Sequence, residues 1–351
     1  MSMKVRVLAK TNPGLEDLLA TELAALSSGA TYCVSEGRVL YDTGLDEVVK
    51  ILKLSKLAHR ISIVVFKGKI PKALNGVREA EAIAESIEWE NYISAGETFA
   101  VKAERVGEGH EYTSIDIASS VGEGIVRRVG EKLGVRVHLK SPNKLVYADV
   151  IDDELIISVG VGSCKSMHRR WYRVREHPAS LKPTLAYAML WLSQAIDGEV
   201  ILDPMCGCGT IPIEAALELE ESRIYCNDIN EKWIKYAREN ALLARVYHRI
   251  KFTSTDAVEL PERHGVYRVQ NIICNPPYGI RMGSIREACI ALSKLFKLAS
   301  KTLTEDGRLV LITPMLRTAL KYSDRAGLTL YHKRRVKHGD LRAWILCFIK
   351  E

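Results

Sequence analysis

From residue 181 onward, short apolar segments alternate with helical stretches, and this alternation limits the possible folds more than any other feature of the chain. The apolar segments are Val200–Leu202, Ile224–Cys226, Ile250–Thr253, Asn271–Cys274 and Leu309–Ile312. Regular alternation of strands and helices predicts a parallel, doubly wound sheet. At the end, Leu328–Lys337 and Leu341–Ile349 flank His338-Gly339-Asp340, which indicates a hairpin. We therefore expect residues 181–351 to form an α/β domain whose mostly parallel sheet has an antiparallel last strand.

The first 162 residues predict two smaller α/β domains. Residues 1–68 follow the order strand, helix, strand, strand, helix, strand, which is the ferredoxin-like arrangement. Residues 69–162 contain a second set of helices and strands and end in a hairpin with Asp152-Asp153 at its turn. The ferredoxin-like fold hosts many functions, so these two domains do not identify an activity by themselves.

Residues 163–180 lack apolar periodicity, and basic side chains alternate with aromatic ones, so we expect a basic linker. Its candidate RNA contacts are Arg169, Arg170 and Arg173. Arginine can bind phosphate through two parallel hydrogen bonds, and the neighbouring Trp171 can stack on a base. The segment is therefore a solvated connection between domains, a phosphate contact, or both.

The formal net charge of +7 is unevenly distributed along the chain. Residues 1–160 carry 20 Lys and Arg against 23 Asp and Glu, so the basic excess lies in the linker and the last domain. The basic run Lys333, Arg334 and Arg335 is either the solvated edge of a terminal strand or a further RNA contact. A modest basic excess is compatible with an acidic polymer as partner, but it identifies none.

The composition excludes several classes of protein. With 47% hydrophobic and 26% charged residues, the chain is neither disordered nor fibrous. No apolar run approaches the ~18 residues that span a bilayer, and the start, Met1-Ser2-Met3-Lys4, has no apolar signal core. The eight cysteines show no metal-ligand or disulfide-framework spacing. We therefore expect a cytoplasmic, monomeric protein with no membrane segment and no metal.

A glycine-containing loop follows the first strand of the last domain. It reads Asp203-Pro204-Met205-Cys206-Gly207-Cys208-Gly209, and a helix follows directly. Glycines let the backbone turn tightly and approach a ligand beside a helix N-terminus, although such a loop can also be a simple turn. A dinucleotide-binding fingerprint would have a third glycine where Pro212 stands. The preceding Asp203 can instead bind an ammonium group, which a dinucleotide lacks.

Two further acids follow the next two strands. Asp228 lies 21 residues after Gly207 and can accept hydrogen bonds from both ribose hydroxyls of an adenosine. Asp256, followed by Ala257, can accept a hydrogen bond from the adenine amino group. Each acid alone could be a loop or N-cap residue. Three acids at the ends of three successive strands predict a site for an adenosine that carries an amino-acid tail.

The motif Asn275-Pro276-Pro277-Tyr278 follows the fourth strand. The two prolines stiffen the loop and hold Asn275 extended. The Asn275 side-chain oxygen and the Pro276 carbonyl can then accept hydrogen bonds from an exocyclic amine and orient its lone pair toward a methyl donor. Tyr278 can stack on the base that carries this amine. The motif predicts amine methylation without a covalent nucleophile.

Taken together, these motifs resemble those of class I S-adenosylmethionine methyltransferases that act on amino groups. The whole chain resembles THUMP-domain-containing RNA guanine-N2 methyltransferases, most closely the tRNA enzymes that act on guanine 6 of the acceptor stem. The resemblance implies S-adenosylmethionine as cofactor and tRNA as partner. It also implies that the second small domain, residues 69–162, is an RNA-binding THUMP domain.

The resemblance assigns roles to individual residues. Residues 178–186 are expected to close over the methionine end of the cofactor with Thr184 near its carboxylate, although Thr184 could simply begin a helix after Pro183. The complete expected cofactor site is Thr184, Asp203, Pro204, Cys206, Gly207, Gly209, Asp228, Asp256, Ala257 and Asn275. The expected catalytic group is Asn275, Pro276, Pro277 and Tyr278.

Four alternatives remain open. The same chemistry could act on guanine 10 of tRNA or on ribosomal RNA, but Asn275 at the head of the motif favours the guanine-6 group, since the guanine-10 relatives typically have Asp there. An NAD-dependent oxidoreductase is disfavoured by Pro212 and by the Asn275 motif. A non-catalytic RNA-binding protein is disfavoured by the complete set of cofactor residues.

Overall fold

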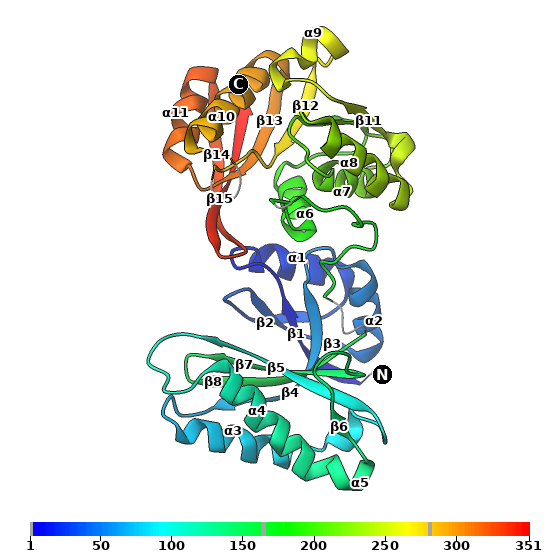
Figure 1. The fold of residues 1–351 in the computed structure, drawn as a ribbon, viewed down its shortest axis with the longest axis vertical. Helices are drawn as coiled ribbons and strands as arrows, with labels where there is room; N and C mark the ends of the chain where they lie inside the picture. The colour runs from blue at the N-terminus through cyan, green and yellow to red at the C-terminus, as the bar shows by residue number, and fades with distance from the viewer. Residues whose placement is uncertain (1–2, 163–165, 178, 280–282) are drawn as a thin grey trace. The chain divides into compact units, whose positions relative to one another are not determined.

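The computed structural model describes residues 3–162, 166–177, 179–279 and 283–351 (Figure 1). The chain divides into two compact units. The first contains Met1–Thr11 and Leu19–Met167, and the second contains Asn12–Leu18 and His168–Glu351. Within the described ranges, none of the helices combines the length and apolar character needed to cross a membrane.

One eight-stranded sheet forms the framework of the first unit, in the order β2-β3-β1-β4-β8-β7-β5-β6. The strands are β1 (Lys4–Lys10), β2 (Ala30–Ser35), β3 (Arg38–Gly44), β4 (Arg60–Lys69), β5 (Thr98–Val106), β6 (Arg136–Val137), β7 (Lys144–Ile151) and β8 (Glu154–Gly160). The order β4-β1-β3-β2 is that of the expected ferredoxin-like fold. The sheet continues past residue 68, because β4 pairs antiparallel with β8.

The helices of the first unit follow the apolar spacing of the sequence. They are α1 (Glu16–Leu26), whose first three residues belong to the second unit, α2 (Leu45–Leu54), α3 (Asn75–Ser86), α4 (Ser114–Ile125) and α5 (Glu131–Leu133), with a 3₁₀ turn at Trp89–Asn91. Helix α4 begins with a capping box, in which Thr113 accepts a hydrogen bond from the Asp116 N–H and Asp116 accepts one from the Thr113 N–H. The sequence predicts one helix over Ser114–Leu133, and the structure places a π-helical segment, Val126–Gly130, within it.

Buried ion pairs connect the two halves of this sheet. The Asp149 carboxylate on β7 is fully buried and pairs with the guanidinium groups of Arg38 on β3, at 2.7 Å, and of Arg60 on β4. Arg38 also contacts Glu104 on β5 at 2.9 Å. Burial alone would raise the pKa of Asp149, but the two arginines outweigh it and hold that pKa below its ordinary value. These ion pairs thus connect β3 and β4, in one half of the sheet, with β5 and β7, in the other half.

A seven-stranded sheet forms the framework of the second unit, in the order β11-β10-β9-β12-β13-β15-β14. The strands are β9 (Val200–Asp203), β10 (Arg223–Asn227), β11 (Ile250–Thr253), β12 (Val269–Cys274), β13 (Leu303–Thr313), β14 (Leu328–His338) and β15 (Leu341–Lys350). Strands β9 to β13 pair in parallel, and β15 runs antiparallel between β13 and β14. The predicted parallel sheet with an antiparallel last strand is confirmed.

Helices cover both faces of this sheet. They are α6 (Pro183–Leu192), α7 (Thr210–Glu218), α8 (Glu231–Leu243), α9 (Leu260–His264), α10 (Ile285–Thr302) and α11 (Leu316–Ala326), with 3₁₀ turns at Tyr247–Arg249 and Ala257–Glu259. Figure 1 shows α7 and α8 on one side of the sheet and α10 and α11 on the other. The central strands β9 and β12 are buried along almost their whole length. Their apolar side chains are therefore covered on both faces of the sheet, as buried parallel strands require.

Residues Asn12–Leu18 form part of the second unit and lie along the edge strand β14. The Lys337 N–H donates to the Pro13 carbonyl at 3.0 Å, and the Asn12 Nδ2 donates to the Lys337 carbonyl at 2.8 Å. Gly14 has φ +96°, and a Cβ there would lie 2.1 Å from the Arg335 carbonyl oxygen. Only glycine therefore allows this close approach.

We predict that Asp149→Ala lowers the free energy of unfolding by about 3–5 kcal/mol, because it removes the buried carboxylate that pairs with both Arg38 and Arg60. The matched control is Asp42→Ala, which breaks the half-exposed Arg6–Asp42 pair and costs at most about 1 kcal/mol. Urea unfolding followed by circular dichroism measures both. Equal losses in the two variants would contradict the assignment.

The same pair has a definite pH dependence. Because the native pKa of Asp149 lies below its unfolded value, its contribution to stability is complete above the unfolded pKa. The contribution is lost as pH falls through the native pKa. The wild-type and Asp149→Ala proteins should therefore converge in stability at acid pH.

Candidate cofactor and active site

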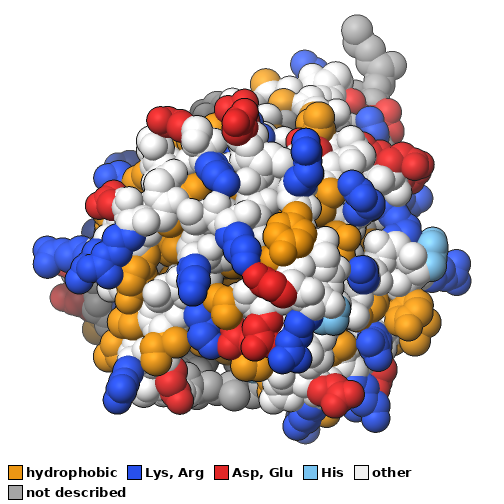
Figure 2. Space-filling model, turned by 90° about the horizontal axis from the view of Figure 1, so that it is seen from above, with side chains coloured by type: hydrophobic (Ala, Val, Ile, Leu, Met, Phe, Trp, Pro, Cys, Tyr) orange, Lys and Arg blue, Asp and Glu red, His pale blue; other side chains and the backbone are white. Residues whose placement is uncertain are grey.

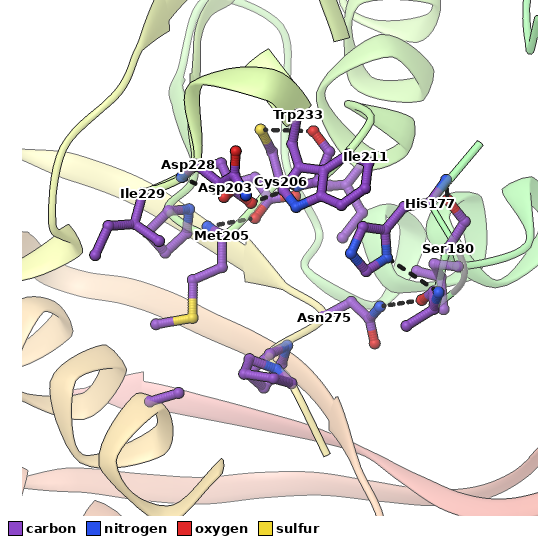
Figure 3. A pocket seen from close by; sticks show the side chains of 18 of the residues that line it. His177, Ser180, Asp203, Met205, Cys206, Ile211, Asp228, Ile229, Trp233 and Asn275 are labelled. Atoms are coloured by element: carbon purple, nitrogen blue, oxygen red, sulfur yellow. Dashed lines mark hydrogen bonds between the residues drawn. The ribbon is translucent and has the colours of Figure 1, made fainter. Parts of the chain in front are cut away.

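A cavity of about 590 Å³ lies at the carboxyl ends of β9, β10 and β12 (Figure 3). Ligands of open α/β sheets bind at this edge, where successive loops meet. The residues that line it come from the expected loops and from their neighbours: His177, Ala179, Ser180, Leu181, Asp203, Pro204, Met205, Cys206, Gly207, Cys208, Thr210, Ile211, Asp228, Ile229, Asn230, Trp233, Asp256, Ala257, Asn275, Pro276, Pro277, Tyr278, Glu287, Ile290, Ala291, Lys294, His338 and Leu341.

Two glycines shape the loop between β9 and α7. Gly207 has φ +52°, and its N–H donates to the Asp228 carboxylate at 2.9 Å. Gly209 has φ +80°, and a Cβ there would lie 2.9 Å from the Cβ of Ala237 on α8. The first glycine therefore joins two loops, and the second lets α7 pack closely against α8.

Two of the three expected acids are strongly desolvated. Asp203 is 2% exposed, and burial raises its pKa well above the ordinary value, to which the nearby Asp228 also contributes. Its described partners are the Met205 N–H, at 3.1 Å, and the Cys274 thiol. Burial also raises the pKa of Asp228. Figure 3 shows both carboxylates on the same wall of the cavity.

The third acid, Asp256, has two roles at its end of the cavity. It is the N-cap of the 3₁₀ turn Ala257–Glu259 and accepts a hydrogen bond from the Val258 N–H at 3.3 Å. Its second carboxylate oxygen pairs with Lys294 on α10. Sequence reasoning identified Asp256 but missed Lys294, because nothing in the spacing of a helix 38 residues away indicates this contact.

The Asn275 motif forms the opposite wall of the cavity. The Tyr278 hydroxyl donates to the Asn275 Oδ1 at 2.5 Å, and the Asn275 Nδ2 donates to the Ala179 carbonyl at 3.5 Å. The Tyr278 ring also makes an edge contact with His338, with ring centroids 6.5 Å apart. Gly279 follows with φ +70°, and a Cβ there would lie 2.5 Å from the Ser284 carbonyl oxygen. The motif is therefore held on both sides.

Asn227, at the end of β10, is a fully buried residue whose role the sequence did not reveal. Its Nδ2 donates to the carbonyls of Pro204 and Thr255, each at 3.0 Å. Its Oδ1 accepts hydrogen bonds from the Thr253 hydroxyl, at 2.9 Å, and the Thr255 N–H, at 3.2 Å. One amide therefore joins the loops that follow β9, β10 and β11.

Asn240 on α8 is a second buried amide of this kind. Its Nδ2 donates to the carbonyls of Cys208, at 3.1 Å, and Arg175, at 3.0 Å. Its Oδ1 accepts from the N–H groups of Val174, at 3.2 Å, and Arg175, at 3.0 Å. It thus connects the glycine loop to the expected linker. The sequence could have indicated Asn240, because it is a polar residue on the same helix face as Ala237 and Ala241, which are buried.

Part of the expected linker is a wall of the cavity. Arg170 pairs with the buried Glu214 of α7 at 3.0 Å, and the Tyr172 hydroxyl donates to the same carboxylate at 2.6 Å. Farther along, the His177 ring contacts the Trp233 ring edge-on, with centroids 4.3 Å apart. We call residues 170–181 the strap, omitting Pro178, which lies outside the described residues. Arg170 is thus engaged in an internal ion pair rather than free for RNA.

Two further expected residues are engaged with the Asn12–Leu18 segment. Thr184 is fully buried, its hydroxyl donates to the Asn12 Oδ1 at 2.9 Å, and it is not among the described residues that line the cavity. Arg334 donates to the Gly14 carbonyl at 2.9 Å and pairs with Asp17. The Thr184 hydroxyl therefore has an internal partner in Asn12, and Arg334 has one in Asp17.

The remaining expected RNA contacts differ in exposure. Arg169, Lys333 and Arg335 are exposed, whereas the Arg173 side chain is only 10% exposed and lies 3.7 Å from Glu176. Trp171, between the strap arginines, is 64% exposed. On the face drawn in Figure 2, Lys and Arg side chains are interspersed with acidic and hydrophobic ones. That face therefore shows no continuous basic field.

The donor set of this cavity fits S-adenosylmethionine. Asp203 is a buried carboxylate whose described partners include no cation, and an ammonium group of a ligand would supply one. Asp228 offers acceptor oxygens for hydroxyl groups, and the exposed Ile229 beside it offers an apolar surface for a ring. The desolvated acids and the apolar walls thus match a ligand with a cationic end and an adenosine.

Comparisons with known proteins agree with this arrangement. Residues 170–343 match the model of an RMKL-like methyltransferase domain, residues 77–160 match the THUMP domain, and residues 6–62 match the RlmL ferredoxin-like domain.

Relatives match along nearly the whole chain. A tRNA (guanine(6)-N2)-methyltransferase of Archaeoglobus fulgidus is 30% identical over 99% of this chain and 93% of its own length. One of Thermus thermophilus is 35% identical over 95% of this chain and 96% of its own. The crystal structure of TrmN from Thermus thermophilus has a TM-score of 0.81 and 31% identity, covering 99% of this chain and 100% of that one. The chain therefore belongs to the family of THUMP-domain-containing methyltransferases that includes the tRNA (guanine(6)-N2)-methyltransferases.

Proposed function

We propose that this protein is an S-adenosylmethionine-dependent tRNA methyltransferase that modifies the exocyclic amine of guanine 6, acting as a monomer in the cytoplasm. The observation that carries the proposal is the cavity itself, which has desolvated acids on one wall and the Asn275 amide on the other. Relatives at 30% and 35% identity that bear this activity in their names support the choice of tRNA and of guanine 6.

The acids bind and orient the cofactor in this proposal. Asp203 pairs with its ammonium group, which balances a buried carboxylate that has no cation among its partners in the described part of the chain. Asp228 accepts hydrogen bonds from the ribose hydroxyls, and its position is fixed by the Gly207 N–H. Asp256, held by Lys294, stands at the adenine end. When bound, S-adenosylmethionine supplies an electrophilic methyl group.

Asn275 positions the target amine. Its Oδ1 already accepts one hydrogen bond from Tyr278, and the second lone pair of that amide oxygen can accept an N–H of guanine. The Pro276 carbonyl accepts the other N–H, so the nitrogen lone pair faces the methyl donor. Positioning of this kind needs no protein nucleophile. A guanine in a stem must leave its stack to arrive here, which costs a few kcal/mol.

Local groups near the strap and β14 are the proposed RNA contacts. Arg169, Lys333 and Arg335 are exposed cations, and Trp171 is an exposed ring on which a base can stack. Contacts with phosphates release counterions, so binding should weaken steeply with salt. We omit Arg170 and Arg334 from the interface because both are in internal ion pairs.

Nucleoside mapping on unmodified tRNA tests the proposed function. The protein is incubated with labelled S-adenosylmethionine and tRNA, and the labelled nucleoside is identified and located. We expect N2-methylguanosine at position 6 and no label when guanine 6 is replaced by adenine. Label at guanine 10, or only on ribosomal RNA, would select one of the related alternatives. Label on adenine or a pyrimidine would overturn the assignment to guanine.

We predict that Asn275→Ala lowers the rate of methyl transfer by at least about a hundredfold, because the amine is no longer oriented. The dissociation constant for S-adenosylhomocysteine should change much less, since the acids are untouched. Asn91→Ala, at an exposed site in the first unit, is the control and should keep wild-type activity. Single-turnover rates and calorimetry provide the two readouts. Unchanged transfer in Asn275→Ala would exclude the proposed mechanism.

We predict that Asp228→Asn raises the cofactor KM by about 10- to 100-fold, because a charged acceptor of two hydroxyl hydrogen bonds is lost. The control is Asp306→Asn at an exposed position with φ +60°, a conformation that Asn tolerates.

The pH profile separates a binding role from a structural one. Burial raises the pKa of Asp228, so cofactor affinity in the wild type should fall as pH drops through this raised value and the carboxyl is protonated. Asp228→Asn should lack the part of this loss that Asp228 causes, whereas Asp203, whose pKa burial also raises, still titrates in the variant. An identical acid limb in both proteins would show that another group titrates.

A further inference from the structure

Two buried thiols lie in direct contact beneath the glycine loop. Cys226, on β10, is fully buried, and its Sγ lies 2.8 Å from the Sγ of Cys206 in the loop after β9. A disulfide bond has an S–S length of about 2.05 Å, so the two sulfur atoms need to approach by only about 0.8 Å. Cys274, another buried thiol near the cavity, is hydrogen-bonded to the Asp203 carboxyl instead.

The backbones around both cysteines are already fixed in register. The Cys206 N–H donates to the Asn227 carbonyl, directly after Cys226, at 2.8 Å. The next residue, Gly207, donates to Asp228 at 2.9 Å. Both chain segments are therefore held side by side by hydrogen bonds that do not involve the sulfur atoms. A cross-link between the two thiols fits this arrangement without unfolding the loop.

Only one of the two thiols can be reached from outside. Cys206 lines the cavity (Figure 3). It is 8% exposed, whereas Cys226 has no exposed surface. Burial raises the pKa of both thiols, so few thiolates are present at neutral pH and exchange is faster at higher pH. An oxidant must therefore enter through the cavity and meet Cys206 first.

We propose that Cys206 and Cys226 are a reversible redox pair, which closes to a disulfide beneath the glycine loop when a low-molecular-weight disulfide enters the cavity. The Cys206 thiolate attacks one sulfur of the external disulfide, forms a mixed disulfide and displaces a thiolate, which takes up the proton that Cys206 lost. The Cys226 thiolate then attacks the Cys206 sulfur and displaces the second external thiol. Two protein thiols are oxidised, and one external disulfide is reduced to two thiols.

Bound cofactor shields the pair, because a ligand in the cavity covers Cys206. The shielding rests on the proposed function, whereas the pairing of the two thiols does not. The disulfide closes a loop of about 20 residues between the two cysteines, and this loop reduces the conformational freedom of the unfolded chain. The oxidised protein should therefore be more resistant to heat than the reduced one, and a thiol reductant should reverse the gain.

The test treats the full-length protein with oxidised glutathione at mildly alkaline pH and identifies cross-linked peptides by mass spectrometry. We expect the mass to fall by two hydrogens, with Cys206 joined to Cys226, and the melting temperature to rise by roughly 5–10 °C. The protein unfolded in guanidinium is the reactivity control. A native protein that stays unreacted while the unfolded one reacts, or a lasting glutathione adduct on Cys206, would overturn the proposal, as would a lowered melting temperature.

Two variants assign the roles of the thiols. Cys226→Ser should keep one glutathione on Cys206, because the resolving thiol is missing. Cys208→Ser, a change in the same loop, should form the Cys206–Cys226 cross-link as the wild type does. Cross-linking through Cys208 or Cys274 in the wild type would contradict the pairing.

Protection by ligand separates this inference from the proposed function. S-adenosylhomocysteine at ten times its dissociation constant should slow cross-linking about tenfold, because only the free cavity reacts. Cross-linking at an unchanged rate would overturn the shielding while leaving the thiol pair in place. A protein that cross-links as expected but transfers no methyl group to tRNA would overturn the function and not the pair.

Discussion

The cavity of the second unit depends on two buried amides, Asn227 and Asn240. Parallel strands bring their carboxyl ends to one edge of the sheet, but the loops beyond those ends need their own hydrogen bonds. Asn227 supplies them between the loops after β9, β10 and β11. Asn240 connects the strap to the glycine loop, because its amide donates hydrogen bonds to the carbonyls of Arg175 and Cys208. Because all four hydrogen-bonding directions of each amide are used, the cavity walls are positioned before any ligand enters.

The hydrogen bonds of Asn227 and Asn240 also explain the electrostatics of the site, because they fix the loops that carry its acids. Asp203 and Asp228 are held where little water reaches them, so ionising their carboxyl groups costs free energy. A cationic ligand offsets this free-energy cost. The strap contains both Arg175, which is hydrogen-bonded to Asn240, and Ala179, whose carbonyl accepts a hydrogen bond from the Asn275 Nδ2. The wall with the acids and the wall with Asn275 are therefore connected through one segment, which fits the proposed positioning of the amine without a covalent intermediate.

The sequence was most informative where a pattern is local. Alternating strands and helices predicted the parallel sheet, and strand-end acids predicted Asp203 and Asp228 at its edge. It was least informative about partners far apart in the chain, because periodicity carries no pairing information. The sequence predicts Arg170 as an RNA contact, whereas the structure pairs its guanidinium group with Glu214, 44 residues away. The expected border near residue 68 likewise gave no sign that β4 pairs with β8 in one sheet.

The proposed site aims a methyl donor at Asn275, and a crystal structure with S-adenosylhomocysteine tests this arrangement most directly. We expect the ammonium group beside Asp203, the ribose hydroxyls on Asp228 and the thioether sulfur facing the Asn275 side chain. A ligand bound elsewhere, or one whose sulfur faces away from Asn275, would contradict this arrangement.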